Sequence, residues 1–243
     1  MKIKILLVIV SLFTLSSCAD SKMTSQGDIN TSIDSYSIKN VKYNERTIDI
    51  SYPSISGIQD TQKQTKINDL LKSEAFRELS DFSNDKSNST EDIIISLNNN
   101  ILHKSYNFLS VSYSGDVMIK GAAYPRSIFT TVNVDLNSGN RIRLSEVISI
   151  NDDFINIVRN TLNSYIDKNP EWKIVYMDLL NHDDNYFLDL FNKADSESNS
   201  DCFSYFTNDS LGLSFATFHA AGDHFEVEIK YADLGDVPKT NIK

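Results

Sequence analysis

Two groups of histidine and aspartate residues have side chains that could bind a metal ion. His182, Asp183 and Asp184 are adjacent, between two stretches of helical periodicity. Three adjacent side chains cannot all converge on one ion, and no distant ligand set accompanies them. His219 and His224 flank an Ala-Ala-Gly-Asp turn, but a zinc site there would need a third ligand and supporting groups. We expect solvated loops that contain no metal.

Acid and thiol groups near residue 200 could bind calcium or act as a nucleophile. Asp195, Glu197 and Asp201 lie in a stretch rich in Ser and Asn. Their spacing is looser than a calcium loop requires, and no glycine provides its sharp turn. Cys202 lies in the strand-like run Cys-Phe-Ser-Tyr-Phe, which is typical of a buried, small apolar residue. The sequence leaves open whether residues 182–184 or 195–201 bind a metal, and what Cys202 does.

The chain lacks the motifs of the common hydrolases. It has no Gly-x-Ser-x-Gly elbow, and no order of Ser, His and Asp is recognisable against the background of such residues. Paired catalytic carboxylates cannot be seen in a sequence, so a cell-wall enzyme stays an alternative. We expect no catalytic residues and no cofactor.

The start of the chain predicts a lipid anchor. Residues 1–17 form a lipoprotein signal peptide, in which Lys2 and Lys4 are followed by an apolar core too short to span a bilayer. The Leu-Ser-Ser-Cys that ends at Cys18 is a lipobox, so Cys18 would receive a diacylglyceryl group after cleavage. Residues 18–34 are polar and predict a disordered tether. We therefore expect a location in the cell envelope, attached to a membrane and outside the cytoplasm.

The charge of the chain is acidic and restricts its partners. There are 23 basic and 33 acidic residues, a net charge of −10, which becomes −12 once Lys2 and Lys4 are removed. This argues against a nucleic-acid partner and against an electrostatic contact with anionic lipid, and it permits cationic partners. With Cys18 acylated, Cys202 is the remaining cysteine, so no intramolecular disulfide can form.

The central stretch, residues 108–140, has the pattern of antiparallel strands. Apolar residues alternate with serine from Leu109 to Tyr113, and a second run places Ile128, Thr130, Val132 and Val134 on one face. Gly115 and Asp116 are expected to interrupt the first strand, and a third strand begins at Arg141. These three strands would form the centre of a sheet.

Further strands and helices flank this centre. Strands are expected at 36–43 and at 47–52, the second stopped by Pro53, and at 92–103, 211–218 and 224–231. Helical spacing joins Ile67, Leu70, Leu71, Ala75, Leu79 and Phe82 after a capping box from Thr61 to Gln64. Helical stripes also run through 154–166 and 186–191, and a third places Trp172, Val175, Tyr176, Leu179 and Leu180 on a buried face.

This order predicts an α+β fold, a mainly antiparallel sheet with helices packed on one face. Residues 35–104 would form a strand-strand-helix-strand part and residues 105–236 a sheet-and-helix part, joined in one compact body. Residues 237–243 would form a tail.

The turn between the two central strands is the candidate binding surface. Gly121 begins it, Tyr124 offers an aromatic face and a hydroxyl, and Arg126 a cation. Exposed aromatic and Arg side chains are the usual anchors of protein interfaces. The alternative is that Tyr124 folds over the sheet edge and Arg126 covers apolar surface with its stem.

Two segments resemble a known extracytoplasmic domain. GAAYP, followed by TVNVDLNSGNRIRLSEVI, is similar to the Gly-Gly-Ala-His-Pro turn, the Asn-x-Asp-x-x-x-Gly hairpin and the helix start of the domain found in RsiV-type anti-sigma factors and PdaC-type peptidoglycan deacetylases. YFTNDSLGLSFATFHAAGDHFEVEIKYADL resembles its closing segment. Here Ala122 replaces the second glycine of the turn, and Tyr124 stands where histidine is usual.

The resemblance implies a binding function. The RsiV-type domain senses lysozyme by binding it, so lysozyme or another basic protein is the expected partner of a lipid-anchored, non-catalytic relative. The chain lacks the Asp-Asp and His-x-x-x-His ligands of the PdaC-type catalytic domain, and the sigma-binding and transmembrane segments of the anti-sigma factors. A peptidoglycan- or carbohydrate-binding module, or a cell-wall enzyme, is the alternative.

Overall fold

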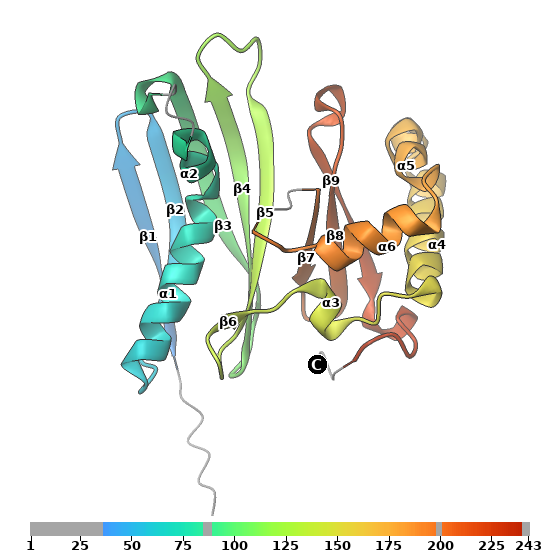
Figure 1. Ribbon diagram of the computed structural model, residues 1–243, viewed down its shortest axis with the longest axis horizontal. Helices are drawn as coiled ribbons and strands as arrows, with labels where there is room; N and C mark the ends of the chain where they lie inside the picture. Colours follow the sequence, from blue (N-terminus) through green and yellow to red (C-terminus); the bar gives the residue numbers. More distant parts are fainter. Residues whose placement is uncertain (1–35, 85–88, 198–200, 240–243) are drawn as a thin grey trace, which may run out of the picture. The chain divides into compact units, whose positions relative to one another are not determined.

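The computed structural model describes residues 36–84, 89–197 and 201–239 (Figure 1). Its contacts separate residues 1–32 from residues 33–243, and every described residue belongs to the second unit. The predicted signal peptide, Cys18 and the tether predicted for 18–34 lie outside the described residues, as does the end of the predicted tail from residue 240. Among the described residues, no helix has the length and apolar character needed to cross a membrane.

The fold is α+β, as predicted, and its larger sheet has the strand order β1-β2-β3-β4-β5-β6. The strands are β1 (Ser37–Glu45), β2 (Ile48–Ser56), β3 (Ile93–Lys104), β4 (Phe108–Ile119), β5 (Arg126–Asp135) and β6 (Asn140–Arg141). Only β2 and β3 run parallel; every other neighbouring pair in this sheet is antiparallel. The sequence predicted two parts, residues 35–104 and 105–236. β3 belongs to the first and β4 to the second, and the two strands pair, so this sheet contains strands of both parts.

Two strands continue where the sequence predicted an interruption. β4 runs through Gly115, where a Cβ atom would lie 1.9 Å from the carbonyl oxygen of Ser96 on β3. The glycine therefore permits a close approach of two strands and does not break one. β2 continues through Pro53 to Ser56, with Pro53 opposite Asn40 of β1.

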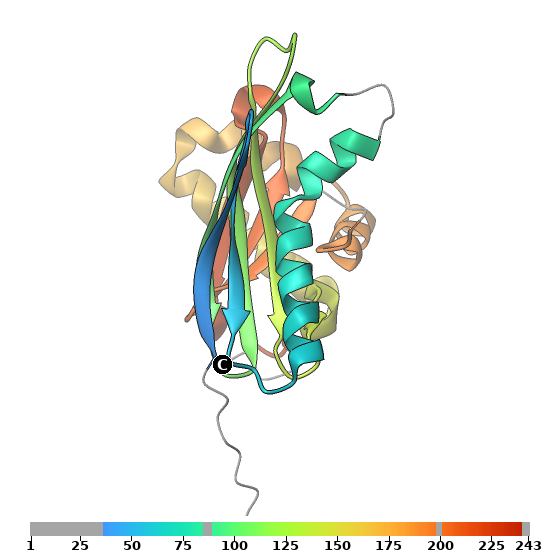
Figure 2. The same cartoon turned by 90° about the vertical axis from the view of Figure 1, so that its left-hand side faces the viewer.

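Two helices cover one face of the larger sheet (Figure 2). α1 (Thr61–Ala75) begins at Asp60, whose side chain accepts a hydrogen bond from the backbone N–H of Lys63, so the predicted capping box at Thr61 is wrong. The single helix predicted here ends at Phe76 and α2 (Arg77–Asn84) follows. Buried side chains of α1 meet a core that contains apolar residues of β2 to β5.

Three further strands form a second sheet, which is antiparallel with the order β7-β8-β9. They are β7 (Cys202–Phe206), β8 (Ser210–Ala216) and β9 (His224–Lys230). The prediction that the last strands complete the central sheet is therefore wrong. As predicted, Cys202 is buried; it belongs to the apolar core that the second sheet shares with the helices between β6 and β7.

Helices also cover the second sheet (Figure 1). They are α3 (Leu144–Val147), α4 (Asp152–Lys168), α5 (Lys173–Leu180) and α6 (Asp184–Lys193), and 3-10 turns occupy 90–92, 170–172, 219–221 and 231–233. Val175, Tyr176 and Leu179 are buried as predicted, but the side chain of Trp172 is 41% exposed. Trp172 lies in the 3-10 turn that precedes α5, so it does not share the buried face of the helix.

Side chains connect the two sheets where β5 meets β7. The Thr131 hydroxyl and the Asn133 side-chain amide of β5 donate to the carbonyl oxygen of Ser204, at 2.5 Å and 2.9 Å. The hydroxyl of Ser110 accepts from the backbone N–H of Phe206 at 3.0 Å. These buried polar contacts satisfy groups at the junction of the sheets without extending either backbone ladder.

Candidate binding cleft

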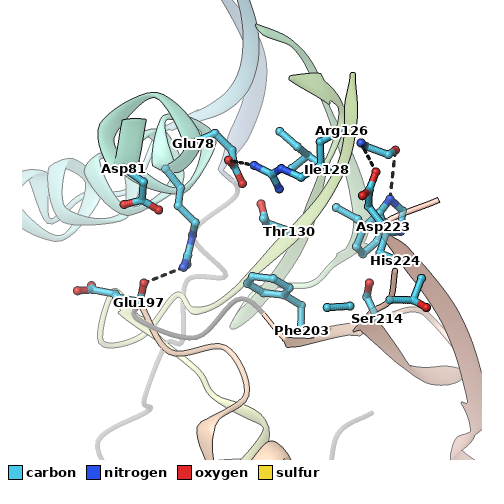
Figure 3. A pocket seen from close by; sticks show the side chains of 15 residues that line it. Glu78, Asp81, Arg126, Ile128, Thr130, Glu197, Phe203, Ser214, Asp223 and His224 are labelled. Carbon is cyan, nitrogen blue, oxygen red and sulfur yellow. Dashed lines mark hydrogen bonds and ion pairs between the residues drawn. The ribbon is translucent and has the colours of Figure 1, made fainter. Parts of the chain in front are cut away.

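A cleft of about 620 Å³ lies where β5, α2 and the second sheet meet (Figure 3). β5 contributes its first half, Arg126 to Thr130. Phe203 of β7 and Ser214 of β8 also line it. The volume falls within the range of small-ligand pockets and could equally admit several residues of a peptide.

A network of ion pairs fixes the α2 side of the cleft. Glu74, which is buried at the end of α1, accepts two hydrogen bonds from Arg77 at 2.7 Å and 2.9 Å, and one from Arg141 at 2.6 Å. Arg77 also donates to the carbonyl oxygen of Glu197 at 2.9 Å, so the chain after α6 is attached to α2. The exposed side chain of Asp81 completes this side.

A carboxylate fixes the opposite side of the cleft. Asp223 has a φ of 69°, and its side chain accepts from the backbone N–H of Ser127 at 2.7 Å and contacts His219 Nδ1 at 2.8 Å. His224 Nδ1 lies 2.6 Å from a carboxylate oxygen of Glu226. The loop between β8 and β9 is therefore anchored to the first residues of β5.

Exposed aromatic side chains gather beside the cleft at the tips of two hairpins. Tyr124, in the β4–β5 turn, is 72% exposed, and Phe218, in the β8–β9 loop, is 45% exposed. The rings of Tyr124 and His219 have centroids 6.5 Å apart, so the two tips lie side by side. A partner that covered this region would bury apolar area on both tips.

The three predicted binding residues lie in or next to this region. Gly121 has a φ of 90°, which glycine adopts without strain, and no described residue other than its chain neighbours comes within 4 Å of a Cβ built on it. Tyr124 is exposed, contrary to the alternative in which it folds over the sheet edge. Arg126 lines the cleft and donates to Glu78 of α2 at 2.5 Å. Their role in binding stays a prediction.

The histidine and acid groups that resembled metal ligands have structural contacts. His182 stacks on Tyr186 with ring centroids 3.7 Å apart. Asp183 caps α6 by accepting from the N–H of Tyr186, and Asp184 pairs with Arg159 at 2.8 Å. Within the described ranges, no three His, Cys, Asp or Glu side chains are grouped so that they could hold a metal ion.

The acids near residue 200 have different environments. Asp195 is buried and accepts hydrogen bonds from the N–H groups of Leu144 and Ser204 and from the hydroxyl of Ser204. Glu197 is exposed at the cleft, and Asp201 is exposed where β7 begins.

Glu78, Asp81, Phe203 and Asp223 also line the cleft, and the sequence did not predict them as site residues. Glu78 and Asp81 occupy polar positions in a stretch of helical periodicity, and Phe203 lies in a strand-like run, so no local motif marks them. Asp223 stood in an expected turn, where its contact with Ser127, 96 residues away, leaves no local signal.

The chain was compared with known proteins. No family model matches it, and no curated protein matches it. Among solved structures, a DUF3298 family protein from Pseudomonas aeruginosa PAO1 has a TM-score of 0.54 and 10% identity, covering 85% of this chain and 96% of its own. A member of the same family from Bacteroides fragilis has a TM-score of 0.49 and 13% identity, covering 86% and 96%. DUF3298 is the family of RsiV-type extracytoplasmic domains. At these identities, the comparison establishes a fold shared with the Pseudomonas aeruginosa protein and nothing about activity.

Proposed function

We propose that this protein is a lipid-anchored, non-catalytic binding protein of the cell envelope, and that its partner is lysozyme or another cationic extracytoplasmic protein. The observation that carries the proposal is the pair of hairpin tips with exposed aromatic rings beside a cleft rich in carboxylates. Aromatic side chains supply most of the binding energy in many protein interfaces. The sequence resemblance to RsiV-type domains selects lysozyme within this class of partners.

The charge of the protein suits such a partner. Lysozymes are strongly basic, and the chain without Lys2 and Lys4 has a net charge of −12. Opposite charges speed the encounter of two proteins more than they determine affinity. The aromatic tips would then supply the apolar contact that slows dissociation.

Partners within the chain hold two carboxylates of the cleft in place. Glu78 pairs with Arg126, and Asp223 is engaged by Ser127 and His219. These contacts hold the walls of the cleft in place, as the surface of a binding site requires.

The test of the proposal is the binding of the purified full chain, in detergent, to a chicken-type lysozyme measured by biolayer interferometry. Replacing Tyr124 and Phe218 together by Ala should weaken binding at least tenfold, because both lose their aromatic contact area. Tyr106→Ala is the matched control, since Tyr106 is 69% exposed and precedes β4, at the end of that strand opposite to Tyr124. The chain should also slow lysozyme-driven clearing of cell-wall suspensions.

Two results would contradict the proposal. One is the absence of any lysozyme binding at low salt. The other is retention of the chain on purified peptidoglycan, or release of reducing ends or acetate from it, which would favour the carbohydrate-binding or enzymatic alternative. The anchor is tested separately: Cys18→Ala should move the protein from the membrane fraction to the soluble fraction, because the acyl chains attach only to that thiol.

A further inference from the structure

The edge of β5 that borders the cleft has backbone groups directed away from β4. Backbone groups of successive residues in a strand point to opposite sides. The N–H of Ser127 donates to Asp223, and the carbonyl oxygen of Asn133 accepts from Ile142, both on the side away from β4. Phe129 shares their parity, so its N–H and C=O point to the same free edge.

Among the described residues, no strand covers this edge at Phe129. β6 pairs only with Val134 and Asp135 at the far end of β5. Within the described part of the chain, Phe129 has no backbone hydrogen-bond partner on that side, and it lines the cleft. An open strand edge with room beside it is a template for an added strand.

The two faces of this edge differ in chemistry, which restricts the strand that could add. Residues directly opposite each other on paired strands have side chains on the same face. The ring of Phe129 lies against Tyr205 and His224, so the residue opposite Phe129 would meet an aromatic surface. The residues on either side of it would face α2, because Arg126 and Thr130, of the other parity, line the cleft with the α2 carboxylates.

The α2 side of the cleft favours basic side chains. The lining of the whole cleft contains four carboxylates against two guanidinium groups, Arg77 and Arg126. Glu78, Asp81 and Glu197 are the carboxylates on the α2 side, and Asp223 lies on the opposite side. Of the four carboxylate residues, Asp81 and Glu197 are the exposed ones. A Lys or Arg side chain that pointed toward α2 would meet this negative excess.

We propose that an extended segment of a partner protein adds to the free edge of β5 at Phe129, with an apolar residue opposite Phe129 and basic residues on either side of it. This inference rests on the proposed function, because it assumes that the partner is a protein. It adds how that partner is held. The backbone of the segment would exchange two hydrogen bonds with Phe129, while its basic side chains would lie near Asp81 and Glu197.

The probe is the capped peptide Thr-Lys-Val-Lys-Thr, added to the full chain in detergent, with binding measured by calorimetry and amide exchange. N-methylation of its Val removes the N–H that would bond to Phe129, so binding should fall at least tenfold. The counterpart Thr-Glu-Val-Glu-Thr should bind at least tenfold more weakly than the Lys peptide. Exchange of the Phe129 amide should slow at least fivefold with the Lys peptide and be unchanged with the other two.

Variants of the protein provide the second arm. Phe129→Pro removes the N–H from an edge where proline is tolerated, and should abolish peptide binding. Asp81→Lys should weaken the Lys peptide at least fivefold even if Phe129→Pro fails to fold. Asp49→Lys is the control with the same charge change, on an exposed position of β2, and should leave peptide binding unchanged.

The outcomes separate this inference from the proposed function. If lysozyme binds but the Lys peptide does not, or binds equally well when N-methylated, strand addition at β5 is wrong and the binding function stands. If the peptide binds as expected and lysozyme does not, the inferred edge stands and lysozyme is the wrong partner. Protection of amides elsewhere in the chain, without protection at Phe129, would also overturn the inference.

Discussion

At the scale of single residues, Asp195 is a carboxylate buried where the two sheets are joined. It has a φ of 61° and accepts three hydrogen bonds, from Leu144 and from the N–H and hydroxyl of Ser204. Burial raises the pKa of its carboxyl from 3.8 to about 6, even though the hydrogen bonds from Ser204 and Leu144 act in the opposite direction. The folded protein therefore holds a proton on Asp195 more tightly than the unfolded chain does.

This difference predicts the sign of a pH effect. The stabilisation from protonated Asp195 is complete below pH 3.8 and is lost as the pH rises through about 6, which amounts to about 3 kcal/mol at 1.36 kcal/mol per pKa unit. Asp195→Asn cannot titrate, so the unfolding free energy of the wild type minus that of the variant should fall by up to this amount between pH 4 and 7. Urea unfolding at successive pH values measures it. A difference that stayed constant across this pH range would refute the linkage.

Glu74 is the second buried acid on which the structure depends. Its side chain is 1% exposed and pairs with Arg77 and Arg141. The Nε and Nη1 atoms of Arg141 are buried and have no hydrogen-bond partner among the described residues. Glu74→Gln should lower the unfolding free energy by about 3–5 kcal/mol, because two guanidinium groups would stay buried without their counter-charge. Glu91→Gln, which removes an exposed pair with Arg46, should cost less than about 1 kcal/mol. Equal losses in the two variants, measured by urea unfolding, would contradict this.

The residues of the site could be predicted from sequence only where a local pattern marks them. Gly121, Tyr124 and Arg126 belong to one turn between two alternating strands, and that turn is visible in the sequence. Glu78 joins them through an ion pair with Arg126 across 48 residues, which no local spacing encodes. Asp223 enters the same way, through Ser127. Convergence of distant segments is a property of the packed chain.

At the scale of elements, β3 and β4 approach each other closely at Gly115. A Cβ at Gly115 would lie 1.9 Å from the Ser96 carbonyl oxygen, which is backbone and cannot move aside alone. Gly115→Ala should therefore lower the unfolding free energy by about 1–3 kcal/mol and speed amide exchange in both strands. Ser114→Ala, on the exposed neighbour, should stay within about 0.5 kcal/mol. A neutral Gly115→Ala would mean that the two strands separate at little cost.

Element positions followed the periodicity of the chain, whereas their assembly into sheets did not. The alternation in β4 and β5 and the stripes of α4 and α6 placed these elements correctly, because the apolar side chains of each gather on one face. In β4 and β5 polar side chains of the other face, such as Ser110 and Thr131, are buried as well. Alternation states which face of a strand is buried but not which strand lies beside it. β7 to β9 form a second sheet, which side-chain hydrogen bonds such as that from Thr131 to Ser204 join to the first. The sequence pattern does not contain these contacts.

At the scale of the whole molecule, the acidic charge predicts how association with a basic partner depends on salt. The net charge of −12 without Lys2 and Lys4 would attract lysozyme over distances comparable to the Debye length, about 30 Å at 0.01 M salt and less than 10 Å at 0.3 M. The association rate constant should fall at least tenfold between these concentrations, and the dissociation rate constant should change less than threefold, because the contacts made after docking are screened less.

Stopped-flow or interferometric kinetics at five salt concentrations would measure both constants. Succinylated lysozyme, whose lysines have become acidic, is the control and should not associate at low salt, since the attraction is then reversed. If the association rate constant did not change with salt concentration while the affinity fell as salt was added, there would be no long-range attraction between the two proteins. The dependence would then lie in dissociation, and local ion pairs at the cleft, such as those of Asp81 and Glu197, would hold the partner in place of the charge of the whole chain.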